Sequence, residues 1–326
     1  MTQLDETTGT TTAPEATASA PARRRLGQSS LEVFPLALSG TVFGWTADDA
    51  TSTAILDAYA ERGGNFIDTA DSYAAGRSET MIGNWMRARR NRADIVVATK
   101  VGKSADNPGL RARVLTRAVN DSLERLGTDR IDVLYLHIDD PTVEFEETLL
   151  AVDELIRAGK VRYFGGSDHT GNRLIEARIA SAQLGVAPMV ALQNHYNLVH
   201  REEYENGLAH VAAQQGLAVM PRFALASGFL TGKYRQRADV ARYPRGSEVA
   251  RLMTRKNLRV LAALDEVAAA HESTVAPVSL AWLLTKPNVV APVVSASGPE
   301  QVPELMAAPW VRLTRHQAAD LDRASS

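Results

Sequence analysis

Short apolar segments that favour β structure recur eight times along the chain, and segments with the apolar spacing of helices lie between them. A short hairpin around Gly27 to Val33 precedes the first segment. The eight predicted strands are Leu36 to Leu38, Asn65 to Asp68, Ile95 to Thr99, Val133 to Leu136, Tyr163 to Gly165, Val190 to Gln193, Leu217 to Met220 and Val289 to Val293. The predicted helices are Ser52 to Arg62, Ser78 to Arg89, Arg111 to Leu126, Phe145 to Ala158, Asn172 to Leu184, Tyr204 to Gln215 and Lys256 to Ala270.

Strands that are apolar on both faces and alternate with helices are satisfied by a closed parallel barrel, because both faces of each strand are then buried. The rival fold is an open, doubly wound sheet. That fold normally binds dinucleotides through a GxGxxG turn after its first strand, and no such turn follows Leu38. The sequence therefore predicts an α/β protein with a (β/α)8 TIM barrel and a short N-terminal β-hairpin.

The length of the chain, 326 residues, suits one such barrel. Residues 1 to 22 are rich in Thr, Ala, Ser and Pro and predict a disordered tail, which leaves 23 to 326 as the barrel domain. The Arg-rich stretch from Tyr234 to Met253 lacks a clear period, so we expect a long loop over the barrel mouth or an insertion. Ser78 followed by Glu79 suits a helix start, with the hydroxyl as the cap.

Charge and hydropathy bear on the class of partner. The formal net charge is −2, which gives no positive field for nucleic acid or a membrane surface. No apolar run approaches the roughly 20 residues that cross a bilayer. Arg23 to Arg25 are not followed by the uninterrupted apolar stretch of an export signal. We therefore expect a cytoplasmic protein without nucleic-acid or membrane partners.

Polar side chains cluster where three neighbouring predicted strands end. Asp68 ends the second strand and Tyr73 follows in its loop, Lys100 follows the third strand, and His137 follows the fourth. Active sites of such barrels lie at the carboxyl ends of the strands, so these four residues should converge. Singly, each is more often an ion pair, a packed ring or a satisfied polar group. Together they predict catalysis.

This set suits proton donation to an oxygen that becomes negative. The Lys100 ammonium should favour the ionised form of Tyr73 and lower its pKa. Asp68 would hold Lys100 and offset its charge. His137 could donate to a carbonyl oxygen and orient it.

The runs NFIDTADSY with GRSE behind it, ATKV and DVLYLH resemble the catalytic segments of the aldo-keto reductase superfamily, in particular its bacterial NAD(P)H-dependent members. LSGTVFGW, GGSDH, LQNHYNLVHR and LASGFLTGKY match as well. The resemblance covers roughly residues 25 to 310 and is specific in order, spacing and strand context.

The resemblance implies an oxidoreductase of the alcohol dehydrogenase class that passes a hydride from an extended nicotinamide cofactor to an aldehyde or ketone, with Tyr73 as proton donor and Asp68, Lys100 and His137 as its catalytic partners. NADPH is the implied cofactor and NADH the alternative. Trp45, Tyr73 and His137 would line the substrate pocket, and no metal is implied. The implied cofactor-binding residues are Gly40, Thr41, Asp68, Ser167, Asp168, Gln193, Arg222, Leu225, Ser227, Gly228, Lys233, Ser295, Ser297 and Gln301.

Two departures from the family pattern concern the nicotinamide. Arg222 stands where most members have a tyrosine that stacks on the ring, and Asp168 replaces an asparagine at the carboxamide. A third concerns the adenosine end, where Ser295, Gly298 and Gln301 supply no cation for a 2′-phosphate. NADPH remains the expectation from the family majority.

Other functions stay open. The barrel could be a cofactor-binding regulatory or redox-sensing subunit, as potassium-channel β subunits of this superfamily are. It could reduce nucleotide-linked deoxysugar intermediates, with Arg222, Arg235 and Arg237 meeting the diphosphate. A metal-dependent hydrolase would draw on His137, His169 and His195, but no His-x-His follows the first strand. The sequence leaves the natural substrate and the oligomeric state, including a homo-oligomer, undetermined.

Overall fold

The computed structural model of the protein describes residues 21–242 and 246–326. The predicted tail therefore lies outside the described residues except for its last two. The described chain begins with an antiparallel hairpin of β1 (Arg24–Arg25) and β2 (Glu32–Val33), as predicted. Gly27 has a φ of +55°, and a Cβ there would lie 2.4 Å from the carbonyl oxygen of Val190. The hairpin thus packs directly against the barrel strands.

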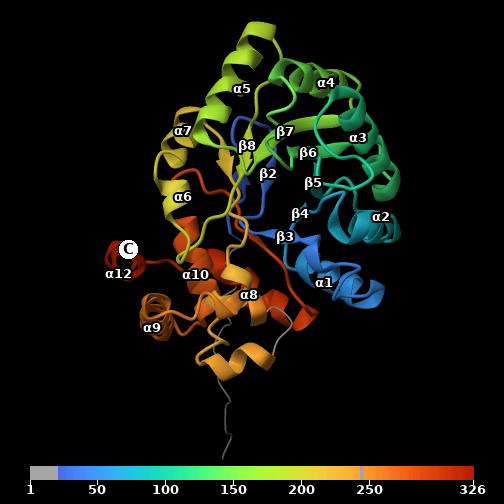
Figure 1. The fold of residues 1–326 in the computed structure, drawn as a ribbon. Coiled ribbons are helices and arrows are strands. Elements are labelled where there is room, and N and C mark those ends of the chain that lie inside the picture. Colours follow the sequence, from blue (N-terminus) through green and yellow to red (C-terminus); the bar gives the residue numbers. More distant parts are fainter. Residues whose placement is uncertain (1–20, 243–245) are drawn as a thin grey trace, which may run out of the picture.

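Eight parallel strands are present, in an order that closes around an axis (Figure 1). Seven lie where they were predicted, whereas the last shares only Val293 with the predicted Val289 to Val293, of which Val289 forms an isolated bridge to Val219. Val219 N donates to Asn288 O at 2.8 Å, and Val290 N donates to Val219 O at 2.9 Å, which joins the two ends of the sheet. The predicted (β/α)8 barrel is confirmed. The strands are β3 (Ala37–Ser39), β4 (Phe66–Asp68), β5 (Val96–Val101), β6 (Ile131–Leu136), β7 (Val161–Ser167), β8 (Ala191–Gln193), β9 (Ala218–Val219) and β10 (Val293–Val294).

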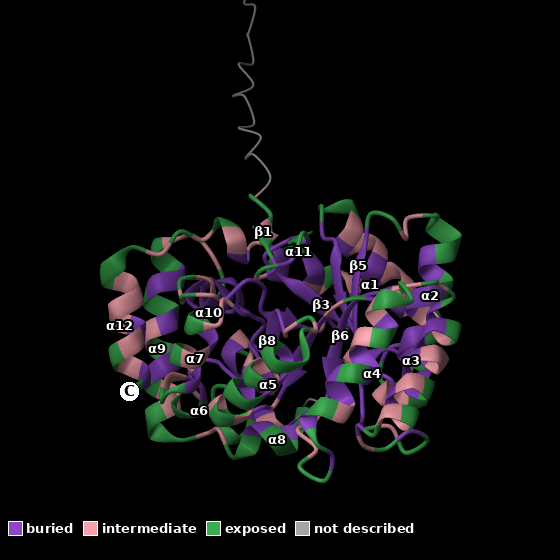
Figure 2. Cartoon of the chain, turned by 90° about the horizontal axis from the view of Figure 1, so that it is seen from above, coloured by how far each residue is buried: buried purple, intermediate pink, exposed green. Residues whose placement is uncertain are grey.

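Helices surround the sheet, and their buried faces pack on its outer side (Figures 1 and 2). Gly207, with a φ of +104°, divides the predicted helix Tyr204 to Gln215 into two short helices. Val275–Leu284 forms a buried helix that its uniformly apolar sequence did not reveal. The helices are α1 (Asp49–Glu61), α2 (Arg77–Arg89), α3 (Ala112–Leu126), α4 (Phe145–Arg157), α5 (Gly171–Leu184), α6 (Glu202–Glu205), α7 (Leu208–Gln214), α8 (Gly246–Ala250), α9 (Arg255–Ala270), α10 (Val275–Leu284), α11 (Val302–Met306) and α12 (Arg315–Ser325).

A second, smaller core fills the barrel itself. Phe66, Val96, Val133 and Tyr135 contribute to it from adjacent strands, and Leu31 of the hairpin packs into the same cluster. The barrel is therefore a packed interior and not a pore, and polar chemistry is confined to where the strands end.

The start of α2 differs from the prediction. Gly76 occupies the cap position, and the Ser78 hydroxyl makes no capping bond. Instead it donates to Gly40 O at 2.8 Å and lies 2.8 Å from the Thr69 hydroxyl. Glu79 is in the first helical turn as expected. Ser78 therefore ties α2 to the loops after β3 and β4.

The stretch from Tyr234 to Met253 is the one for which the sequence predicts a long loop or an insertion. Its described residues include a 3₁₀ turn, Arg237–Arg242, and the short helix α8. Asp239 is buried and accepts hydrogen bonds from the backbone of Arg235 and Gln236. The described part of this segment is therefore structured by local polar contacts.

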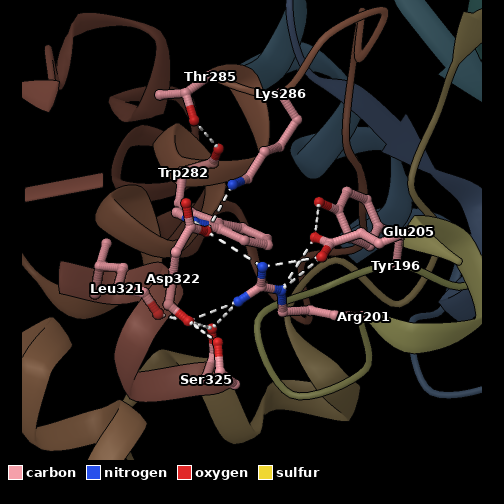
Figure 3. Close-up of polar contacts among 10 residues, drawn as sticks. Tyr196, Arg201, Glu205, Trp282, Thr285, Lys286, Leu321, Asp322 and Ser325 are labelled. Atoms are coloured by element: carbon pink, nitrogen blue, oxygen red, sulfur yellow. Dashed lines mark hydrogen bonds and ion pairs between the residues drawn. The ribbon is translucent and has the colours of Figure 1, made fainter. Parts of the chain in front are cut away.

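The C-terminal helix α12 is fastened to the barrel by a polar network (Figure 3). Arg201, after β8, donates to the Asp322 carbonyl and the Ser325 hydroxyl, each at 2.7 Å. The Asp322 carboxylate accepts from Trp282 at 2.9 Å and Lys286 at 2.6 Å. No helix of the described residues is long and apolar enough to cross a membrane.

Candidate active site

Three neighbouring strands bring together the four residues predicted to act in catalysis. Asp68 is the last residue of β4, Lys100 lies near the end of β5, and His137 directly follows β6. Tyr73 begins a 3₁₀ turn in the loop after β4. Parallel strands end at the same edge of the barrel, which is why residues 69 positions apart in sequence share one site.

Lys100 is the buried centre of the cluster, with 1% of its side chain exposed. Its Nζ lies 2.6 Å from Asp68 Oδ2 and 2.7 Å from Thr69 O, and 5.0 Å from the centre of the Tyr73 ring. Burial disfavours the ammonium, but Asp68 and Tyr73 together more than offset this and hold the pKa of Lys100 above its ordinary value. Lys100 therefore stays charged beneath Tyr73.

Asp68 is also held from the far side of the barrel. Gln193, at the end of β8, donates from Nε2 to Asp68 Oδ1 at 2.8 Å. Each carboxylate oxygen thus has its own donor, Lys100 on one and Gln193 on the other. This satisfies the buried charge and fixes the carboxylate plane.

Tyr73 is half-buried, and its ring meets that of His137 edge to face, with centroids 6.2 Å apart. Burial raises the pKa of Tyr73 above its ordinary value, while Lys100 lowers it in part. The predicted effect of Lys100 is present, but the predicted net lowering is wrong because desolvation outweighs it. Tyr73 is therefore a protonated phenol at neutral pH.

The loop that carries Tyr73 adopts an uncommon backbone. Ala74 and Ala75 have φ values of 49° and 56°, and Gly76 has 83°. Non-glycine residues in the left-handed region cost free energy, and such strain gathers at functional sites. The strained turn holds Tyr73 over Lys100.

His137 is buried and electrically neutral. Burial lowers the pKa of His137 to about 2, with the cations Lys100, Lys103 and Arg222 contributing. Its backbone amide donates to Val101 O, and its Nδ1 has no hydrogen-bond partner among the described residues. A neutral imidazole can donate one ring N–H to a carbonyl oxygen without being protonated first.

Asp168 and Arg222, the two departures from the family pattern, contact each other. Arg222 Nε and Nη2 lie 2.9 and 2.8 Å from Asp168 Oδ1, and Lys103 Nζ lies 3.5 Å from Oδ2. Asp168 directly follows β7 and Arg222 follows β9, and the side chain of each is more than a quarter exposed. An ion pair thus stands at the barrel mouth where the family pattern has an amide and an aromatic ring.

The residues predicted to hold the nicotinamide end also lie at strand ends. Gly40 and Thr41 begin the 3₁₀ turn after β3, and Ser167 ends β7. A Cβ on Gly40 would lie 2.4 Å from Ser78 Oγ, so the close approach requires glycine. Ser167 Oγ is buried with no partner in the described chain. An orphaned buried hydroxyl at this position fits a site that a polar ligand completes.

The segment predicted to bind the pyrophosphate forms a tight turn. Ser227 and Gly228 have φ values of 56° and 93°, and Gly228 N donates to Leu225 O at 2.9 Å. A Cβ on Gly228 would lie 3.5 Å from Lys233 Nζ. The turn therefore gathers Leu225, Ser227, Gly228 and Lys233, and successive backbone amides of this kind suit an anion.

The remaining predicted contacts are less concentrated. Ser297 N donates to Gln301 Oε1 at 2.9 Å, and Ser295 follows β10 on the same stretch. Trp45 lies in the loop after β3 and is 62% exposed. The residues predicted to bind the adenosine, and Trp45, thus lie after barrel strands, and their contacts with a ligand stay predictions.

Sequence reasoning missed the contribution of three residues to the site. Thr69 supplies a carbonyl to Lys100, Ser78 bridges two loops, and Lys103 adds a cation beside Asp168. The signal for Lys103 was its position in the loop directly after Lys100. The carbonyl of Thr69, which accepts from Lys100, and the buried bridge of Ser78 leave no such sequence signal.

No group of three or more His, Asp or Glu side chains in the described chain could hold a metal ion. His169 bonds to Ser167 O, and the His195 ring stacks on that of His200 with centroids 3.7 Å apart. The histidines that follow three adjacent strands thus serve separate local contacts.

Comparison with known proteins adds to this geometry. Residues 37–326 match the aldo/keto reductase family. A probable voltage-gated potassium channel subunit beta from Arabidopsis thaliana is 32% identical over 87% of this chain and 90% of the relative, and its counterpart in Oryza sativa subsp. japonica is 31% identical over the same shares. A norsolorinic acid reductase from Aspergillus flavus is 30% identical over 96% of this chain and 83% of the relative.

Proposed function

The chain belongs to the aldo/keto reductase family, and from this premise we propose that it is an oxidoreductase that reduces an aldehyde or ketone with NADPH. The observation that carries the proposal is the contact of a buried, charged Lys100 with both Asp68 and the ring of Tyr73, with His137 beside them. A bound nicotinamide supplies the hydride. The remaining chemistry is the work of the protein's own side chains.

Tyr73 is the proton donor in this proposal. Its hydroxyl gives a proton to the carbonyl oxygen as negative charge develops there, and the Lys100 ammonium beneath it stabilises the phenolate that remains. Neutral His137 donates a ring N–H to the same oxygen and aligns the carbonyl. Asp68 and Gln193 position Lys100 and do not touch the substrate.

The barrel, residues 23 to 326, is the proposed cofactor-binding and catalytic unit, acting in the cytoplasm. The turn around Gly228 and Lys233 would take the pyrophosphate, and Ser167, with its unpaired hydroxyl, the nicotinamide carboxamide. NADPH is proposed over NADH from the family majority. The absence of a cation at Ser295, Gly298 and Gln301 makes NADH the alternative to be measured.

A direct test compares wild type with Tyr73→Phe and the matched control Tyr163→Phe, whose hydroxyl contacts Ser30 of the hairpin. Quenching of tryptophan fluorescence measures binding of NADPH and NADH, and oxidation of either with an activated aromatic aldehyde measures turnover. We expect Tyr73→Phe to bind the nucleotide normally and to lose at least about 100-fold in turnover. Tyr163→Phe should keep both. Failure of wild type to bind either nucleotide would refute the proposal.

A second function is favoured by the relatives named as potassium channel β subunits. In that case the loaded barrel would act mainly as a regulatory or redox-sensing subunit. Tight nucleotide binding, negligible turnover on a broad panel of carbonyls and a stable protein partner would favour it over the reductase. A panel that includes nucleotide-linked deoxysugar ketones also tests the remaining alternative.

A further inference from the structure

The Asp168–Arg222 ion pair stands beside the atoms proposed to react. Arg222 follows β9 and Asp168 follows β7, while Tyr73 and His137 follow β4 and β6 at the same end of the barrel. The charge of Arg222 reaches both residues, since it opposes in part the rise in the pKa of Tyr73 and adds to the lowering of the pKa of His137. Its field therefore acts on anything bound against them.

The charges around this point do not cancel. Lys100 pairs with Asp68, while Lys103 and Arg222 share the single carboxylate of Asp168. Three cations thus face two carboxylates, which leaves one net positive charge. The Arg222 guanidinium carbon lies 4.9 Å from the centre of the Phe223 ring, a contact that brings no negative charge, and among the described residues Asp168 is the carboxylate that pairs with Arg222.

A hydride donor must lie close to this charge. Direct transfer requires the reacting carbons to be about 3 to 3.5 Å apart, and the carbonyl oxygen must reach Tyr73 at the same time. The nicotinamide ring is thereby placed within a few ångströms of Tyr73 and His137. This ring is neutral when reduced and carries one positive charge when oxidised.

We propose that Arg222 and Asp168 set the relative affinity of the protein for reduced and oxidised nicotinamide, with Arg222 disfavouring the oxidised form and Asp168 partly restoring it. The inference rests on the proposed function and deepens it. A site with net positive charge repels the cationic ring after hydride transfer, which favours release of the oxidised product and makes the bound reduced ring a weaker hydride donor. Arg222 and Asp168 would thus set which form of the cofactor preferentially occupies the site.

The ratio of two dissociation constants isolates this effect. NADPH and NADP⁺ make the same contacts through their phosphates, riboses and carboxamide, so those contacts cancel in the ratio of their dissociation constants. What remains is the interaction with one unit of ring charge. A unit charge about 10 Å away at an effective dielectric constant of about 20 changes the ratio on the order of tenfold.

The experiment measures binding of NADPH and NADP⁺, and of NADH and NAD⁺, by calorimetry and tryptophan fluorescence. Arg222→Gln should lower the ratio of the oxidised to the reduced dissociation constant by about tenfold, and Asp168→Asn should raise it by a similar factor. The double variant should return close to wild type. For a two-electron couple, tenfold in this ratio moves the potential of the bound cofactor by about 30 mV.

Two controls separate charge from shape. Arg222→Lys keeps the charge and alters the planar group, so it should hold the ratio within about twofold of wild type. Arg89→Gln removes an arginine that pairs with Asp57 on the outer surface of α1 and α2, and it should leave the ratio unchanged. If both Arg222→Gln and Asp168→Asn bind nucleotide with an unaltered ratio, the inference is wrong while the reductase proposal stands. If wild type binds no nucleotide, both fail.

Discussion

Gln193 and Asp68 are hydrogen-bonded at 2.8 Å across the interior of the barrel, from strands on opposite sides of the ring. The second oxygen of the same carboxylate holds Lys100. One buried carboxylate therefore links β4, β5 and β8 directly below the proposed reaction centre. Substituting Gln193 and Asp68 in turn measures how much this link contributes to the free energy of unfolding.

Replacing Gln193 by leucine removes the donor and leaves Asp68 Oδ1 buried without a partner. We expect Gln193→Leu to lower the free energy of unfolding by about 1 to 3 kcal/mol, the cost of an unsatisfied buried acceptor. Urea denaturation measures this. Gln183→Leu, on the exposed side of α5, is the matched control and should change stability by less than about 0.5 kcal/mol. Equal effects of the two substitutions would contradict the role of the hydrogen bond.

Asp68→Asn removes the counter-charge of a buried ammonium. Because Lys100 is 1% exposed, we expect a loss of about 3 to 5 kcal/mol in the free energy of unfolding. Adding Lys100→Met should recover part of this loss, since the uncompensated charge is then gone. Urea denaturation of the two single variants and the double variant gives the coupling energy, and strictly additive losses would show that the ion pair contributes nothing specific.

The sequence predicted the barrel and the four converging residues because both depend on short-range patterns. Apolar segments such as that before Asp68 locate a strand, and the polar residue that ends it is then placed by the geometry of a parallel barrel. Asp68, Lys100 and His137 each lie at or near such an end. Their convergence needed no knowledge of individual contacts.

The errors arose where a contact distant in sequence overrides a local preference. Ser78 has the local signature of a helix cap, but its hydroxyl donates a hydrogen bond to the carbonyl oxygen of Gly40, 38 residues away. Asp168 and Arg222 are separated by 54 residues, and no periodicity relates them. The two departures were visible singly, but their pairing required the fold.

The contact between Gly40 and Ser78 predicts a specific non-additivity. A Cβ at position 40 would lie 2.4 Å from Ser78 Oγ and 3.2 Å from Ile82 and Phe43, so Gly40→Ala should destabilise the protein by about 1 to 3 kcal/mol. Ser78→Ala removes the oxygen that clashes. Thermal or urea unfolding of the double variant should show less than the sum of the single losses. A sum that is fully additive would place the strain elsewhere, in the backbone of the turn.

Asp71 gives the fold a pH dependence of unusual sign. Its side chain is 2% exposed, and neither carboxylate oxygen has a well-aligned hydrogen-bond partner in the described chain. Burial, reinforced by the nearby Glu79, raises the pKa of Asp71 to about 7, while Arg125 acts in the opposite direction. The folded protein therefore binds this proton more tightly than the unfolded chain does, whose carboxyl titrates near 3.9.

The sign follows from this difference in pKa. The contribution of protonated Asp71 to the free energy of unfolding is fully present below about pH 4. It is lost as the pH rises to about 7, because Asp71 ionises more easily in the unfolded chain than in the folded protein. Asp71→Asn keeps the shape of the neutral acid and cannot ionise. Its stability relative to wild type should grow between pH 5 and pH 8, by roughly 3 kcal/mol.

Urea denaturation of both proteins at unit intervals of pH measures that growing difference. Asp57→Asn is the control, because the Arg89 side chain holds the pKa of the half-exposed Asp57 below its ordinary value. Asp57 is thus ionised in both states from about pH 5 upward, and its difference from wild type should be flat over the same range. A flat difference for Asp71→Asn as well would mean that Asp71 is ionised in the folded protein at neutral pH, and that a partner neutralises it.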